Sequence, residues 1–139
     1  MKVLFDTNII LDILLDRQPF SEPASILLSK VERSEMDGFL CATTITTIHY
    51  LLSRHLNKEQ AVSGINSIMA LFAIASVNRL VIEDAIKAKF TDFEDSVLHE
   101  AARHASVEYI ITRNIKDFKK AKIPVFTPVE FLNMLESLS

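Results

Sequence analysis

A chain of 139 residues that is 49% hydrophobic and 24% charged has the size and composition of one globular domain, residues 1–139, and not of a disordered chain. Its net charge of −3 and pI near 5.8 argue against a strongly basic protein that coats nucleic acid. The lone Cys41 excludes an internal disulfide, and Asp6 interrupts the first apolar stretch before a signal-peptide core can form. We therefore expect a soluble, cytoplasmic protein with no membrane-spanning segment.

The first half of the chain predicts two strand and helix units. Residues 2–5 form a short apolar run that ends at Asp6, and apolar residues then recur at helical spacing. A loop with two prolines leads to a second helix, which should end before Gly38. A second buried strand is expected over residues 38–42, followed by a helix through Leu52.

The second half of the chain continues this alternation. It predicts three further strands, at residues 72–77, 109–112 and 124–127. The helices expected between and after them begin near Asn57, after the cap Asn78, at Asp92, at Ile115 and at Pro128. Short apolar strands separated by amphipathic helices predict an α/β fold, in which a central parallel sheet of about five strands is flanked by helices in three layers.

Acidic and amide side chains recur where the strands of this sheet should end. Asp6 follows the first strand, Asp92 and Asp95 open a helix, and Asn114 and Asp117 follow the fourth strand. In parallel α/β sheets, ligands bind beyond the carboxyl ends of the strands, so these groups should converge. Carboxylates that converge repel one another unless a cation lies between them. Oxygen ligands of this kind predict a site for Mg²⁺ or Mn²⁺ and not for zinc.

The acids that open the predicted helix at residue 92 also have a structural explanation. A carboxylate in the first turn interacts favourably with the helix dipole, typically by ~0.3–1 kcal/mol, and this explains Asp92 and Glu94. Asp95 is the better ligand candidate, and His99 should lie one turn further along the same helical face.

Other charged residues are expected on the surface. Asp12 and Asp16 should lie in and after the first helix with their carboxylates in solvent. Five basic residues crowd one short stretch, which we interpret first as a solvated face and second as a local nucleic-acid patch. They are Arg113, Lys116, Lys119, Lys120 and Lys122.

Several classes of phosphate chemistry can be set aside. The only glycines are Gly38 and Gly64, so a Walker loop or a dinucleotide-binding glycine motif is excluded. A phosphatase with an aspartate nucleophile, of the haloacid-dehalogenase type, needs a second Asp where this chain has Asn8. A receiver domain needs paired acids at the first strand end and a phosphoacceptor Asp on a middle strand, and neither is found.

The segment Val3–Asp12 resembles the opening of a PIN domain, the family named after the PilT N-terminus. Four later segments resemble the remaining landmarks of the family in the same order, and they are residues 92–97, 101–102, 109–118 and 124–132. The resemblance spans nearly the whole chain. It implies the PIN fold and metal-dependent endoribonuclease chemistry, often found in VapC-like toxins that a small antitoxin protein neutralises.

The resemblance also implies roles for individual residues. The acids that match the catalytic positions of the family are Asp6, Asp95 and Asp117. The implied ligands of Mg²⁺ or Mn²⁺ are Asp6, Asp95, Asn114 and Asp117, with Asp92 as an additional candidate. The residues expected to orient the site or contact an RNA substrate are Thr7, Asn8, Arg113 and Lys116.

One position departs from the family pattern. Near the start of the third helix the family usually has Glu, and this chain has Thr47, with no acid between Asp37 and Glu59. A hydroxyl is a weaker, neutral ligand, so one metal is favoured over two. The alternative function is a catalytically weak or inactive PIN domain that binds RNA or protein, and small domains with apolar helices often form homodimers.

Overall fold

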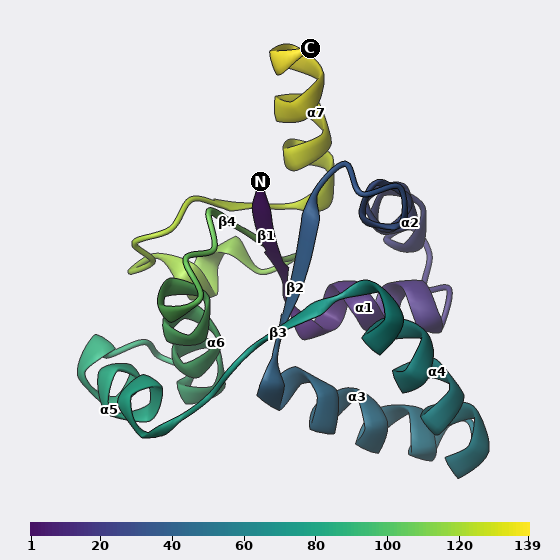
Figure 1. Cartoon of the computed structure of the whole chain (residues 1–139), viewed down its shortest axis with the longest axis horizontal. Coiled ribbons are helices and arrows are strands. Elements are labelled where there is room, and N and C mark those ends of the chain that lie inside the picture. Colours follow the sequence, from purple (N-terminus) through teal and green to yellow (C-terminus); the bar gives the residue numbers. More distant parts are fainter.

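The protein folds as a five-stranded sheet with helices on both faces, as the computed structural model of residues 1–139 shows (Figure 1). All strand pairs are parallel, and the strand order is β3-β2-β1-β4-β5. The strands are β1 (Lys2–Phe5), β2 (Asp37–Cys41), β3 (Ala73–Ala75), β4 (Tyr109–Ile111) and β5 (Val125–Phe126).

Helices connect successive strands or follow the last one. Those of the first half are α1 (Thr7–Leu14), α2 (Ser21–Glu32), α3 (Ala42–His55) and α4 (Lys58–Leu71). Those of the second half are α5 (Arg79–Ala88), α6 (Phe93–His104), the 3₁₀ helix η1 (Ile115–Phe118) and α7 (Pro128–Leu138). None of these helices combines the length and the apolar character that crossing a membrane requires.

The sheet separates two hydrophobic cores, and its central strand β1 contributes side chains to both. Val3 and Phe5 point to one face, where they pack in a cluster with apolar side chains of α1, α2, α3, α4 and α7. Leu4 points to the other face and packs with side chains of α5, α6 and β4. The alternation follows from the period of two in a strand, and burial on both faces explains why every residue from Val3 to Phe5 is apolar. The predicted three-layer α/β fold is confirmed.

The predicted elements are found in the predicted order, with small differences at their ends. The third strand is shorter than residues 72–77, because only Ala73–Ala75 pairs with β2. Pro128 occupies the first turn of α7, where Thr127 caps the helix and forms a reciprocal capping box with Glu130.

The surface position predicted for Asp12 is wrong. Its side chain is fully buried, and Arg17 Nε lies 2.9 Å from Oδ1 and Arg113 Nε 2.9 Å from Oδ2. Two guanidinium groups therefore provide the partners that a buried carboxylate needs. Asp16 is exposed, as predicted.

Candidate active site

A cleft of about 250 Å³ lies at the carboxyl ends of β1 and β4, beside the first turn of α6. Three leucines line it together with nine polar residues. The polar residues are Asp6, Thr7, Asn8, Thr47, Asp92, Glu94, Asp95, Asn114 and Asp117. The strand ends thus bring together all the acids and the Asn that the sequence suggested as ligands.

Asp6 is held at the end of β1 by the neighbouring strand. Its backbone N–H donates to Ile111 O at 2.9 Å, which continues the ladder between β1 and β4. Its Oδ1 accepts from Thr7 N at 2.7 Å, and its Oδ2 accepts from the buried hydroxyl of Thr112 at 2.7 Å. The side chain also caps α1, so its orientation is fixed by both the sheet and the helix.

The first turn of α6 carries three acids into the cleft. Asp92 is the N-cap, and its Oδ1 accepts from Asp95 N at 3.0 Å, as the capping interpretation of the sequence predicted. Asp95 is half-buried and makes no side-chain hydrogen bond in this structure, so its carboxylate is free to face the other acids.

Glu94 has a contact that helix-dipole reasoning did not predict. The hydroxyl of Thr47 on α3 donates to Glu94 Oε1 at 3.3 Å, as well as to the Thr43 carbonyl at 3.2 Å. A carboxylate from α6 therefore lies beside the α3 position where the PIN resemblance leads us to expect Glu.

Asn114 and Asp117 lie at the start of η1, directly after β4. The Asn114 N–H donates to the Thr112 hydroxyl at 3.1 Å, and the Asp117 N–H donates to the Asn114 carbonyl at 3.0 Å. The two side chains both line the cleft because the short helix turns the chain back over the strand end.

The crowded carboxylates hold protons more tightly than isolated ones. Burial, opposed by the Thr112 and Thr7 hydrogen bonds, raises the pKa of Asp6, and Glu94 and Asp117 add repulsion. Burial together with repulsion from Asp6 and from the other cleft acids raises the pKa of Asp95 to about 7. A cation in the cleft would relieve this repulsion.

The donor set has the chemistry of a site for a hard divalent cation. Carboxylate and amide oxygens dominate the cleft, and no His or Cys lines it, which suits Mg²⁺ or Mn²⁺. The side chains are not arranged as a group of three or more His, Cys, Asp or Glu residues that could together hold a metal ion. The fit therefore lies in the type and charge of the donors.

Two residues predicted to contact substrate lie outside the cleft. The Arg113 side chain is paired with Asp12, and its guanidinium lies 4.1 Å from the centre of the Phe20 ring, beside a separate cavity. Lys116 is exposed on η1. Contact of either residue with RNA stays a prediction.

His99 does not share the cleft, contrary to the helical-face expectation. Its side chain is buried on another face of α6, where Nε2 accepts from Lys122 N at 2.9 Å. His99 lies about 6 Å further along the α6 axis than Asp95 and is not among the residues that line the cleft. Its ring packs beneath the loop that follows η1 and carries Lys122.

Comparison with known proteins decides the family. The PIN domain model matches residues 2–116. The chain belongs to the PIN domain family. Ribonuclease VapC1 of Aquifex aeolicus (strain VF5) is 27% identical to this PIN protein, with 99% of this chain and 97% of the relative covered.

Solved structures share the fold of this PIN protein. VapBC-1 from nontypeable Haemophilus influenzae matches with a TM-score of 0.72 and 17% identity, covering 93% of this chain and 99% of the other. A toxin–antitoxin complex from Klebsiella pneumoniae matches with a TM-score of 0.68 and 23% identity, covering 91% and 97%. At these identities the similarity shows the fold alone.

Sequence reasoning missed the roles of Thr112 and Glu94. Thr112 could have been found from the register, because Phe5 pairs with Ile111 and the next residues, Asp6 and Thr112, must then be neighbours. Glu94 had no comparable signal, because its contact depends on how α3 and α6 pack in space.

Proposed function

We propose that this PIN protein is a metal-dependent endoribonuclease that hydrolyses phosphodiester bonds of RNA. The observation that carries the proposal is the acidic cleft, which Asp6 lines from the end of β1, Asp95 from the first turn of α6 and Asp117 from η1. Its similarity to Ribonuclease VapC1 over nearly the full length of both chains supports the same reaction.

The residues of this chain would hold the metal and orient the reacting groups. Asp6, Asp95, Asn114 and Asp117 supply ligand oxygens, and Asp92 and Glu94 are further acids within the cleft. When bound, Mg²⁺ or Mn²⁺ supplies a Lewis acid that offsets the charge of a phosphodiester and lowers the pKa of water.

Other residues of the cleft serve orientation. The Thr112 hydroxyl and the Thr7 N–H each donate to one oxygen of Asp6, and these two hydrogen bonds hold the orientation of the carboxylate that would bind the metal ion. Asn8 lines the cleft from α1 and can donate to a phosphate oxygen, a contact that is independent of RNA sequence.

A cleavage assay tests this proposal. Purified protein should cut end-labelled single-stranded RNA in Mg²⁺ or Mn²⁺, and EDTA should abolish the cutting. Asp6→Asn should reduce the rate by at least about a hundredfold, since it removes charge at the best-oriented ligand. Asp37→Asn is the matched control, because Asp37 is exposed at the amino end of β2, away from the cleft. Equal activity of Asp6→Asn and the wild type would refute the proposal.

A second function is a binding module without catalysis. It is favoured by Thr47, which leaves α3 without an acid in the cleft, and by the absence of a formed three-acid ligand shell. Calorimetry with Mn²⁺ separates the two functions. Binding in the micromolar range that Asp6→Asn abolishes supports the nuclease, and no binding up to millimolar Mn²⁺ supports the module.

We also propose that the protein is a cytoplasmic toxin that pairs with a small antitoxin and forms a homodimer. The support is its fold similarity to the toxin–antitoxin complex from Klebsiella pneumoniae. Large apolar side chains on α5 are available for contacts, since Leu80 is 61% exposed and Ile86 is 64% exposed. Light scattering of the purified chain should give the mass of two copies, and a monomer at micromolar concentration would contradict the dimer.

A further inference from the structure

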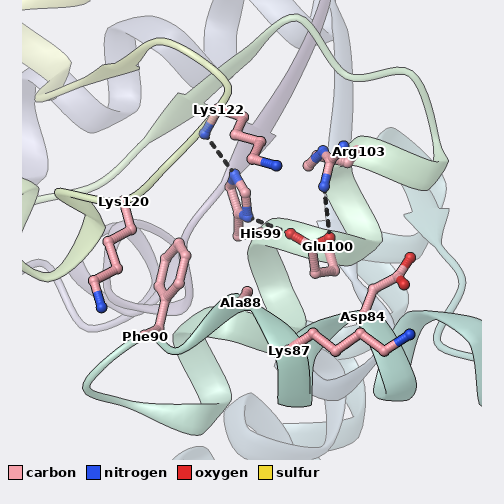
Figure 2. Close-up of a pocket in the computed structure, with 9 residues that line it drawn as sticks. All are labelled: Asp84, Lys87, Ala88, Phe90, His99, Glu100, Arg103, Lys120 and Lys122. Carbon is pink, nitrogen blue, oxygen red and sulfur yellow. Dashed lines mark hydrogen bonds and ion pairs between the residues drawn. The ribbon is translucent and has the colours of Figure 1, made fainter.

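A second cavity, of about 400 Å³, lies between α5, α6 and the loop that leads to β5 (Figure 2). It lies on a different face of α6 from the acidic cleft, because Asp95 and Leu98 line the cleft whereas His99 and Arg103 line the cavity. We call it the basic pocket. Its basic residues are Lys87, Arg103, Lys120 and Lys122.

Positive charge prevails in the basic pocket. Only two acids line it, and both are engaged: Asp84 Oδ2 lies 2.7 Å from His104 Nε2, and Glu100 Oε1 accepts from Arg103 Nη1 at 2.8 Å. Lys87 and Lys122 form no ion pair with any acid of the chain. These two ammonium groups are therefore free to bind an anion.

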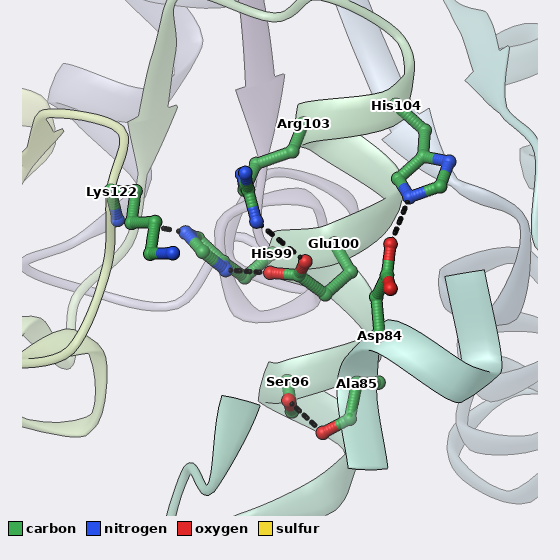
Figure 3. A network of polar contacts seen from close by, with 8 residues as sticks. All are labelled: Asp84, Ala85, Ser96, His99, Glu100, Arg103, His104 and Lys122. Atoms are coloured by element: carbon green, nitrogen blue, oxygen red, sulfur yellow. Dashed lines mark hydrogen bonds and ion pairs between the residues drawn. The ribbon is translucent and has the colours of Figure 1, made fainter. Parts of the chain in front are cut away.

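The wall of the basic pocket is held in place by buried polar contacts (Figure 3). His99 is only 1% exposed, and its Nε2 accepts the backbone N–H of Lys122 at 2.9 Å. The proton of the neutral ring therefore lies on Nδ1, which faces Glu100 Oε2 at 2.6 Å. The loop that carries Lys122 is thus fixed from below by α6.

The helices and the loop that bear the pocket residues are tied together in the same way. Ser96 Oγ donates to Ala85 O at 2.8 Å and ties α6 to α5 inside the core (Figure 3). Lys120 Nζ donates to Lys89 O at 2.8 Å and ties the loop to the end of α5. These contacts hold the surroundings of the pocket in place, so less conformational entropy would be lost if an anion bound there.

The basic pocket is connected to the acidic cleft by two short segments. On α6, Asp95 in the cleft and Arg103 in the pocket are eight residues apart, which corresponds to about 12 Å along the helix axis at 1.5 Å per residue. On the other segment, Asp117 of the cleft is followed closely by Lys120 and Lys122. A few nucleotides of a single strand can bridge such a distance.

We propose that the basic pocket binds a backbone phosphate of the RNA strand whose scissile phosphate lies in the acidic cleft. This inference rests on the proposed nuclease function and adds a second point of contact. Lysine ammonium groups bind phosphate as point charges and carry no sequence information. The pocket therefore supplies affinity and positions the strand, while the acids act on one bond.

Fluorescence anisotropy tests the pocket by direct binding. A labelled 12-nucleotide single-stranded RNA is titrated with Asp6→Asn protein, in which cleavage should not interfere. Adding Lys87→Ala and Lys122→Ala should weaken binding about tenfold and lower the slope of log K against log salt by about 1. The matched control adds Arg54→Ala and Lys58→Ala, which remove the same charge from exposed sites outside the pocket. Equal weakening in the control would overturn the proposal, since general charge would then explain binding.

Two further measurements identify the source of the phosphate. RNAs that extend two to six nucleotides beyond the cut site should bind more tightly to protein with the wild-type pocket, but only from the length at which the strand reaches the pocket. Affinity that does not depend on length would overturn the proposal. The proposal would also be overturned if inorganic phosphate bound in the pocket but the lysine variants bound RNA with unchanged affinity. Pocket-dependent RNA binding by a protein that cuts no RNA with any metal would uphold the pocket and refute the proposed nuclease.

Discussion

Asp12 and Arg113 connect the interior of α1 to the residue that follows β4. The carboxylate of Asp12 is fully buried, with Arg113 Nε 2.9 Å from Oδ2 and Arg17 Nε 2.9 Å from Oδ1. Arg113 also stacks on Phe20, with 4.1 Å between its guanidinium and the ring centre. Because Asn114 comes next in the chain, this pair fixes the base of the segment that carries Asn114 and Asp117 into the cleft.

We expect Asp12→Asn to destabilise the protein by about 3 kcal/mol, because it leaves two guanidinium groups without their buried partner. Urea unfolding followed by circular dichroism measures the change. Asp37→Asn, at an exposed site, should change the free energy of unfolding by less than about 0.5 kcal/mol. A loss in Asp12→Asn no larger than that of this control would show that the ion pairs do not stabilise the fold.

The second prediction concerns Thr112, whose buried hydroxyl donates to Asp6 Oδ2. Thr112→Val keeps the shape of the side chain but leaves that oxygen without a donor, so Mn²⁺ affinity should fall about tenfold. Calorimetry measures the affinity, and Thr112→Ser should restore most of it because it restores the hydroxyl. Wild-type affinity in Thr112→Val would show that Asp6 does not depend on this bond.

The fold could be predicted from sequence because its signals are local. The alternation of short apolar runs with helical periodicity located all five strands, and the cap Asn78 and the first-turn residue Pro128 marked helix starts. The ends of β3 were less certain, since Phe72 is buried whether it ends a helix or begins a strand.

The candidate site could be predicted in part. Asp6 and Asp117 line one cleft because strand ends in a parallel sheet share one edge, which follows from the topology, and Asp95 lines the same cleft from the first turn of α6. The burial of Asp12 could not be predicted, because its partner Arg113 lies 101 positions away in sequence and no local pattern pairs them. The contact between Thr47 and Glu94 has the same origin, since it depends on the packing of two helices.

The third prediction is a pH dependence that arises from Asp95. Burial and the neighbouring acids raise its pKa from 3.8 to about 7 in the folded protein, whereas the unfolded chain keeps the ordinary value. The folded state therefore binds this proton more tightly, so Asp95 lowers stability progressively as the pH rises from about 4 to about 7. In EDTA, Asp95→Asn should remove this effect.

Urea unfolding at pH 4 and pH 8 measures the contribution of Asp95. Because the site is partly solvated, we expect the free energy of unfolding of Asp95→Asn to be higher than that of the wild type by about 1 kcal/mol at pH 8, and by much less at pH 4. Excess Mn²⁺ should stabilise the wild type more than the variant. A variant with the same pH profile as the wild type would show that the cleft acids do not repel one another.

The fourth prediction concerns Thr47, which stands where the family pattern usually has Glu. Thr47→Glu would add an acid from α3 to the cleft, opposite Glu94, whose Oε1 lies 3.3 Å from the Thr47 hydroxyl. Without metal the two carboxylates should repel each other and lower the free energy of unfolding by about 0.5–1 kcal/mol. With Mn²⁺ the added ligand should raise the affinity about tenfold in calorimetry. Thr47→Gln, which has the same size but no charge, is the control, and an equal gain in affinity there would show that the missing charge on α3 does not limit metal binding.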